Sequence, residues 1–177
     1  IYQQVVEAAS ALKADLIIMG THGVTGFREF LIGSNAYRVV SEAQCPVLSL
    51  QTHAKTKGFK NILLPIDDSM HSREKVAYAL EIAEHNASVI HLLGISPDAD
   101  KPFALKMKQV QDLFEKKNIP VHSKNISGDD TATMVLQHAE KCKADLIVIM
   151  TEQDTDITGM LLGPAAQRIV NHSRVPV

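Results

Sequence analysis

The sequence has little cysteine, little net charge and no long hydrophobic run, and each shortage excludes a class of protein. Cys45 and Cys142 stand alone without Cys-x-x-Cys spacing, which argues against a disulfide framework or a zinc knuckle. The net charge of −2, without a block of lysine and arginine, lacks the basic footprint of a nucleic-acid-binding protein. No apolar run reaches the length of about 20 residues that a membrane-spanning helix requires. We therefore expect neither nucleic acid nor membrane as a partner.

The composition predicts a globular cytoplasmic protein. Hydrophobic residues make up 45% of the chain and charged residues 21%, which suits one or two domains with packed cores. The start, IYQQVVEAAS, lacks the basic and apolar regions of a secretory signal peptide. The lone cysteines are then expected to be small core residues in a reducing compartment.

The chain contains one structural unit twice. A shift of 130 positions places KADLII (residues 13–18) on KADLIV (residues 143–148). The match continues through Gly33 and Gly163, Arg38 and Arg168, and Pro46 and Pro176. It needs no gap and relates residues 1–47 to residues 131–177. Such self-similarity predicts two copies of one domain.

Apolar segments alternate with amphipathic segments in the second copy. Strands are predicted at residues 60–66, 88–95, 119–126 and 145–150, with the start of a fifth at 175. Apolar residues recur at helical spacing in residues 76–83, 103–114, 134–142 and 165–171. Alternating strands and helices predict a parallel sheet with helices on both faces.

The first copy begins only at the third helix of this pattern and has no counterpart of residues 60–130. The predicted organisation is the C-terminal half of a first domain at 1–50, a polar linker at 51–58 and a complete second domain at 59–177. An isolated half-domain leaves a sheet edge and apolar faces uncovered. We therefore expect that the chain is part of a longer tandem protein, or that a separate piece completes the first domain.

Four glycines crowd the segment MGTHGVTGFREFLIGSNA, residues 19–36, between a predicted strand and a predicted helix. Glycine costs backbone entropy, so a cluster indicates turns or close approach of the backbone to a ligand. Open α/β sheets bind ligands at the carboxyl ends of their strands, and a helix start attracts anions. The segment predicts a phosphate-binding loop, in which Ser34 caps the helix or contacts a phosphate or a divalent ion.

The spacing of this loop is specific. It lacks the lysine of the P-loop and the spacing of the dinucleotide fingerprint. Gly20, Gly23, Gly33 and Ser34 instead meet the pattern G-x2-G-x9-G-[ST] without departure. The loop resembles the nucleotide loop of the universal stress protein family. NILLPIDDS, residues 61–69, is similar to the family's first strand, after which an aspartate at the position of Asp67 lies beside adenosine.

The resemblance implies an α/β fold with an open, parallel, five-stranded sheet of order 3-2-1-4-5 and helices on both faces, as one complete domain plus the C-terminal half of another copy. It also implies dimerisation through the fifth strand. We therefore expect residues 46–50 and those from 175 onward to lie at the contact between the two copies. The expected assembly is a homodimer or a pseudo-dimer.

The function implied by the resemblance is that of a non-enzymatic, ATP-binding regulator or sensor of the stress response, without catalytic residues or a resident metal site. The cofactor is ATP, accompanied by magnesium or manganese. The expected nucleotide-binding residues are Gly20, Thr21, His22, Gly23, Gly33, Ser34 and Asn35. A base-side half-site in the second domain comprises Pro65, Ile66 and Asp67.

The second copy departs from the loop pattern. Its residues at the positions of Gly20, Gly23, Gly26 and Ser34 are Met150, Gln153, Asp156 and Pro164. Proline removes a backbone donor, and acidic residues repel a polyphosphate. We expect no ATP in the second domain. The first copy lacks its adenosine-side strands, so we expect this chain to bind ATP weakly or not at all.

Several alternatives remain at this stage. The glycine loop can be a connection without a ligand, in a protein that serves as an interaction scaffold. A slow ATPase is the other alternative, although the loop offers no Walker lysine. His22 can act as a base, and Arg28 and Arg38 can neutralise phosphate. Zinc binding lacks support, because His85, His91, His122 and His138 are scattered.

Overall fold

The computed structural model describes residues 1–21, 32–51, 58–97, 101–150 and 162–177. The chain divides into two compact units. The terminal unit consists of Ile1–Lys55 and Thr151–Val177, and the central unit of Thr56–Met150. One junction falls within the predicted linker, whereas the other falls inside the predicted second domain. The last helix of the chain therefore belongs to the same unit as the first copy.

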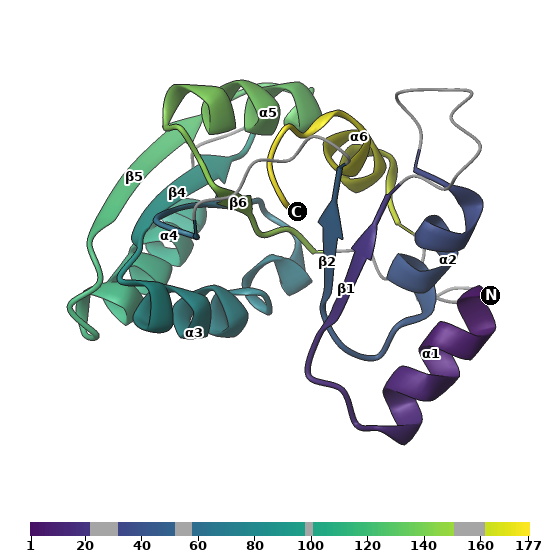
Figure 1. Ribbon diagram of the computed structural model, residues 1–177. Coiled ribbons are helices and arrows are strands. Elements are labelled where there is room, and N and C mark those ends of the chain that lie inside the picture. The colour runs from purple at the N-terminus through teal and green to yellow at the C-terminus, as the bar shows by residue number, and fades with distance from the viewer. Residues whose placement is uncertain (22–31, 52–57, 98–100, 151–161) are drawn as a thin grey trace. The chain divides into compact units, whose positions relative to one another are not determined.

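The central unit is built on a four-stranded parallel sheet of order β5-β4-β3-β6 (Figure 1). Its strands are β3 (Asn61–Ile66), β4 (Val89–Ile95), β5 (Val121–Ile126) and β6 (Leu146–Ile147). Its helices are α3 (Val76–Asn86), α4 (Lys101–Glu115) and α5 (Thr131–Lys141), with a 3₁₀ turn at Met70–Arg73. The predicted alternation of strands and helices in a parallel sheet is confirmed.

Continuous apolar runs place the centre of this sheet in the core. Ile62, Leu63, Leu64 and Ile66 of β3 are fully buried, as a parallel strand covered on both faces requires. Helix α4 buries the residues that its helical spacing predicted, Phe103, Met107, Val110 and Phe114. β5 lies at the edge of the sheet, and its middle residues are exposed. The predicted order is confirmed for the first four strands.

Residues 175–177, predicted as the start of the fifth strand, form no strand and belong to the terminal unit. Their polar groups pair there with Ser49: its N–H donates to the Val177 oxygen at 2.7 Å, and the Val177 N–H donates to the Ser49 oxygen at 3.1 Å. This reciprocal exchange is the hydrogen-bonded pair of an antiparallel ladder. The predicted contact between the two fifth-strand segments is confirmed.

The terminal unit contains a two-stranded parallel sheet of β1 (Ile17–Gly20) and β2 (Val47–Leu50). Its helices are α1 (Tyr2–Ala11), α2 (Ser34–Glu42) and α6 (Pro164–His172). Ile17 packs with Val39 and Ala43 in a small core that Tyr2 and other partly buried residues complete. Ile18 is 61% exposed, because side chains alternate between the two faces of a strand. One face of this small sheet is therefore uncovered at β1.

From the composition we expected the lone cysteines to lie in the core and no helix to span a membrane. Cys45 and Cys142 are free and partly buried. Among the helices within the described ranges, none combines the length and the hydrophobicity needed to span a bilayer.

Candidate functional site

The glycine motif links the carboxyl end of β1 to the amino end of α2. Gly20 is the last residue of β1, and Gly33 immediately precedes α2. The Gly33 N–H donates to the Thr21 oxygen at 2.8 Å, so the two ends of the loop are joined. His22 and Gly23 lie outside the described residues. A strand thus ends where the motif begins, and a helix begins where the motif ends, as predicted.

Both ends of the loop are also anchored to neighbouring elements of the terminal unit. Thr21 is only 2% exposed; its N–H donates to the Leu50 oxygen at 3.0 Å, and its hydroxyl donates to the same oxygen at 3.4 Å. The Ile32 N–H donates to the side-chain oxygen of Asn171 in α6 at 2.6 Å. The two hydrogen bonds of Thr21 therefore tie the start of the glycine motif to β2. The sequence did not single out Asn171.

Helix α2 begins without a side-chain cap. Gly33 is the N-cap residue, with φ −61° and ψ 147°, so Ser34 is the first helical residue and the prediction that it caps the helix is wrong. Ser34 and Asn35 are exposed. The helical ladder starts with the Tyr37 N–H, which donates to the Gly33 oxygen at 2.9 Å. A helix leaves its first N–H groups without partners inside the helix, so those of Ser34, Asn35 and Ala36 are suited to an anion.

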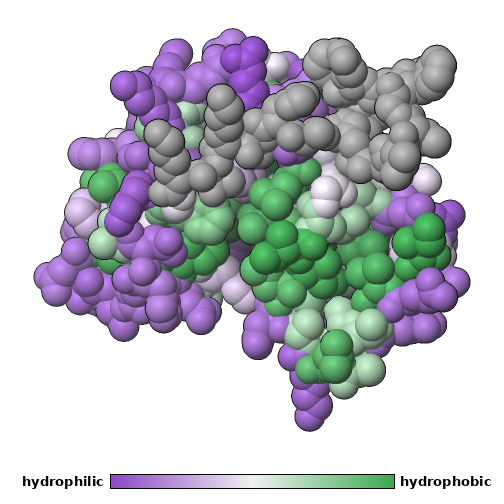
Figure 2. All heavy atoms as spheres, viewed as in Figure 1, coloured by the Kyte–Doolittle hydropathy of each residue, from purple (hydrophilic) through white to green (hydrophobic). Residues whose placement is uncertain are grey.

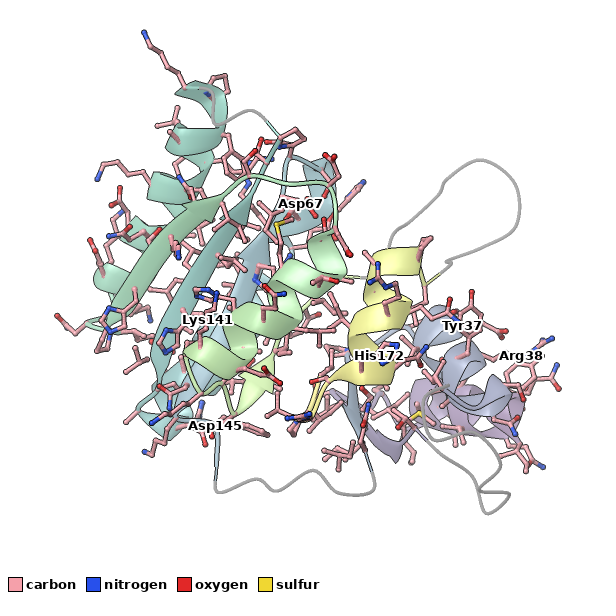
Figure 3. The ribbon with its side chains drawn as sticks, turned by 90° about the horizontal axis from the view of Figure 1, so that it is seen from above. Tyr37, Arg38, Asp67, Lys141, Asp145 and His172 are labelled. Carbon is pink, nitrogen blue, oxygen red and sulfur yellow. The ribbon has the colours of Figure 1, made fainter. Side chains whose placement is uncertain are left out.

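Arg38 is engaged elsewhere in the terminal unit. Its Nη1 donates to the Tyr2 hydroxyl at 3.0 Å, and its guanidinium lies 4.8 Å from the centre of the Tyr2 ring. This cation–π contact links α2 to α1, and Figure 3 labels Arg38 on its helix. The contact gives Arg38 a structural role, which agrees with the persistence of Arg168 in the copy that lacks the loop. Arg28 lies outside the described residues.

The predicted half-site in the central unit is at the carboxyl end of β3, where Figure 3 labels Asp67. Pro65 and Ile66 are buried within the strand, and Asp67 follows it at the edge of the core. The Asp67 carboxylate accepts the Ser69 N–H at 2.9 Å, and the Asp67 N–H donates to the Ser72 hydroxyl at 2.9 Å. Burial raises the pKa of Asp67, but hydrogen bonds from Ser69 and the nearby Lys75 ammonium outweigh it, so the pKa is lowered.

Two lysines flank this aspartate. Lys75 is 5% exposed, and its Nζ donates to the Ser72 carbonyl oxygen at 2.7 Å. Burial lowers the pKa of Lys75 to about 8, with Asp67 opposing and Lys106 adding to the shift. The Nζ of Lys106 donates to the carbonyl oxygens of Asp67 at 3.1 Å and Ser69 at 3.3 Å. Two ammonium groups and a carboxylate therefore meet at the end of β3.

The sequence contained a signal for the buried lysine. Lys75 lies four residues before Ala79, which is fully buried on α3, so its spacing places it on the face of the helix that packs on the core. A lysine at such a position requires a polar partner, and the carbonyl group of Ser72 supplies it.

The adjacent aspartates have different partners. Asp67 accepts the Ser69 N–H, whereas Asp68 accepts the hydroxyl of Ser96 from the end of β4. Side chains of neighbouring residues at a strand end point apart. Within the described part of the chain, no three His, Cys, Asp or Glu side chains are arranged to hold a metal ion.

Two scattered histidines come together on the sheet of the central unit. His91 of β4 lies opposite His122 of β5, and their ring centres are 5.5 Å apart. His91 Nε2 lies 3.2 Å from the side-chain oxygen of Asn61. Burial lowers the pKa of His91, and His122 and His138 lower it further. The spacing in the sequence did not predict this pair, because parallel pairing of β4 and β5 brings it together.

Comparison with known proteins identifies a family over most of the chain. The model of the universal stress protein family matches residues 2–50 and 58–177. A universal stress protein of Methanocaldococcus jannaschii is 31% identical over 137 residues, which cover 67% of this chain and 80% of that protein.

Solved structures show the same fold. A universal stress protein from Archaeoglobus fulgidus matches with a TM-score of 0.82 at 22% identity, over 99% of this chain and 64% of that chain. The chain therefore spans less than two thirds of that structure. A universal stress protein solved in complex with cAMP matches with a TM-score of 0.57 at 18% identity, over 67% of this chain and 94% of that chain. Since the family model covers nearly all of the sequence, the chain belongs to the universal stress protein family.

Proposed function

We propose that the terminal unit binds the phosphate groups of an adenine nucleotide, ATP, between β1 and α2, and that the protein is a non-enzymatic regulator of the stress response. One observation carries this proposal. The motif of Gly20, Gly23, Gly33 and Ser34 starts at the end of a parallel strand and finishes at an uncapped helix start. This is the position at which α/β sheets bind phosphate groups.

Gly33 supports the proposal because the described structure does not require a glycine there. Its φ of −61° is open to every residue, and a Cβ atom would lie 3.4 Å from the Thr21 oxygen, which is ordinary contact. A glycine there leaves the backbone open to close approach by another molecule. Gly163 of the second copy retains the glycine, but there Pro164 occupies the first helical position and removes a donor.

The relative solved with cAMP supports an adenine nucleotide as the ligand. cAMP is the ligand of that protein, and the likeness to this chain is one of fold. A slow ATPase is the alternative function, and a turnover assay separates it from a binding protein. An interaction scaffold without a ligand is the second alternative, which the absence of any nucleotide effect on the loop would favour.

The uncapped start of α2 is expected to respond to ATP in the 177-residue chain. Contacts at a helix start are worth about 0.3 to 2 kcal/mol each, so we expect a dissociation constant near 1 mM, about −4 kcal/mol. Amide NMR shifts of Ser34, Asn35 and Ala36 measure this binding. The start of α6, at Ala165 and Ala166, is the internal control and is expected to show no shift. Equal shifts at both helix starts, or none at α2 with 10 mM ATP (about ten times 1 mM), would contradict the proposal.

Replacement Gly23→Val is expected to abolish the response of α2 to ATP while the fold persists. A branched side chain in the glycine motif is expected to obstruct the approach of a phosphate to the backbone. The measurement is the same ATP titration, together with circular dichroism to check the fold. Equal ATP shifts in Gly23→Val and the parent chain would show that this glycine does not serve the ligand.

A further inference from the structure

Hydrogen bonds close the base of the glycine motif and link it to the last helix of the chain. The Ile32 N–H donates to the side-chain oxygen of Asn171 at 2.6 Å, although 139 positions separate the two residues. The Gly33 N–H, one position later, donates to the Thr21 oxygen at 2.8 Å. Thr21 in turn donates its N–H to the Leu50 oxygen at 3.0 Å. The start of α2 is therefore fixed both to the end of β1 and to α6.

A further link runs from the end of β2 to α6. Gln51, directly after Leu50, donates from its side-chain Nε2 to the carbonyl oxygens of Val170 at 3.0 Å and Asn171 at 2.7 Å. Both carbonyl groups lie in the last turn of α6, where a helix offers them no N–H of its own. Figure 3 labels His172, the neighbour of Asn171, on this helix. The ends of β1, β2 and α6 and the start of α2 thus form a closed ring of hydrogen bonds within the terminal unit.

The contact between Ile32 and Asn171 is buried. Ile32 is 8% exposed, and Asn171 is 5% exposed. Figure 2 shows hydrophobic surface over the region of β1 and β2, the strands that the ring joins. A hydrogen bond counts for more in apolar surroundings, because a buried N–H that loses its acceptor has no water to replace it. Since a backbone N–H only donates, the oxygen of the Asn171 side chain, and not its NH2 group, must face Ile32.

The repeat contains a natural comparison for Asn171. A shift of 130 positions places Ser41 on Asn171 and Ile32 on Leu162. Ser41 is also buried, but its hydroxyl has no hydrogen-bond partner among the described residues. The serine oxygen lies one bond closer to the backbone than the asparagine oxygen does. A side chain of the second copy therefore holds the chain ahead of α2, whereas Ser41 of the first copy does not do the same ahead of α6.

We propose that Asn171 is a positioning residue for phosphate binding: from the second copy of the repeat, it holds Ile32 so that the start of α2 faces the phosphate groups. Asn171 does not contact the ligand and acts through Ile32 and Gly33. A segment that is ordered before the ligand arrives loses less entropy on binding, so this support favours affinity without adding a contact. The inference rests on the function proposed above. It assigns a role to the second copy, whose own motif has lost three of the four glycines.

The first test needs no ligand and compares Asn171→Ala with Ser41→Ala, which changes the equivalent buried position of the other copy. The readout is hydrogen exchange of the Ile32 amide, followed by NMR. We expect about tenfold faster exchange in Asn171→Ala than in the parent chain, because the amide loses its acceptor, and no change in Ser41→Ala. Asn171→Leu keeps the approximate volume of the side chain and is expected to behave as Asn171→Ala does. Equal Ile32 exchange in Asn171→Ala and Ser41→Ala would overturn the proposal.

The second test measures the dissociation constant of ATP from the amide shifts of Ser34 and Asn35. Asn171→Ala is expected to weaken binding about fivefold, because the start of α2 is no longer held in place. Ile169→Val changes a buried position of α6 that takes no part in the ring of hydrogen bonds, so it is the control for a loss of stability alone. It is expected to leave the dissociation constant unchanged.

The outcomes separate this inference from the proposed function. Equal dissociation constants in Asn171→Ala and the parent chain, or an equal loss of affinity in Ile169→Val, would overturn the inference alone. If the parent chain showed no response to ATP, the proposed function would fall together with the role of Asn171 toward a ligand, whatever the exchange rate of Ile32.

Discussion

Replacement Leu146→Ala is expected to cost about 2 to 5 kcal/mol of the stability of the central unit, whereas Leu16→Ala costs less than about 1 kcal/mol in the terminal unit. The two leucines occupy the same position of the repeat. Leu146 is 2% exposed and its removal leaves a cavity beside β3, whereas Leu16 is 45% exposed. The difference in cost therefore measures what β3 contributes to the packing of this position.

Native-state hydrogen exchange reports on each unit separately, because every amide reports the opening of its own surroundings. Amides of β3 and β4 report on the central unit, and those of Ile17 and Met19 report on the terminal unit. Conservative replacements Leu146→Met and Leu16→Met serve as controls and are expected to cost little at either position. If Leu16→Ala lowered stability as much as Leu146→Ala does, Leu16 would have to be buried in the protein in solution.

Deprotonation of Lys75 is expected to contribute about 3 kcal/mol to the stability of the central unit between pH 8 and pH 10.5. Its pKa in the folded protein is about 8, below the ordinary value of 10.5. In this range the unfolded chain binds the proton that the folded chain has released, so stability increases with pH. The gain is complete above the unfolded pKa and is lost as the pH falls through the folded one.

Replacement Lys75→Met isolates this contribution. Other groups titrate in the same range, so the measured quantity is the difference between the stability curves of parent and variant from pH 7 to pH 10.5. We expect the variant to be more stable by roughly 1 to 3 kcal/mol at pH 7, because it removes a buried charge, and the advantage to vanish as Lys75 loses its proton. Lys108→Met, at a side chain that is 72% exposed, is the control. Parallel curves for Lys75→Met and the parent would contradict the low pKa.

The repeat and the apolar runs were sufficient to predict most of the fold. KADLII and KADLIV located the two copies, and the run NILLPI predicted the buried centre of the sheet. The spacing of Gly20 and Gly33 predicted a loop between a strand and a helix. These features are local, since a strand or helix pattern depends on neighbours within a few residues.

Site residues could be predicted only where they follow one another within a single segment of the sequence. Asp67 follows its strand immediately and was identified, whereas the buried ammonium of Lys75 was not, although its spacing on α3 placed it toward the core. The pair of His91 and His122 depends on the register between β4 and β5. No local pattern contains a register, because it is decided by which residues of two distant segments pair.

The sequence by itself determined the family, the order of the first four strands, the glycine loop and its loss in the second copy. Only the tertiary structure decided that α6 and Val177 belong with the first copy, where Val177 exchanges hydrogen bonds with Ser49. It also decided that Leu146 is covered while Leu16 is exposed. The physical reason is that burial and strand pairing depend on which segments are present to pack together, so two nearly identical sequences such as KADLII and KADLIV acquire different surroundings.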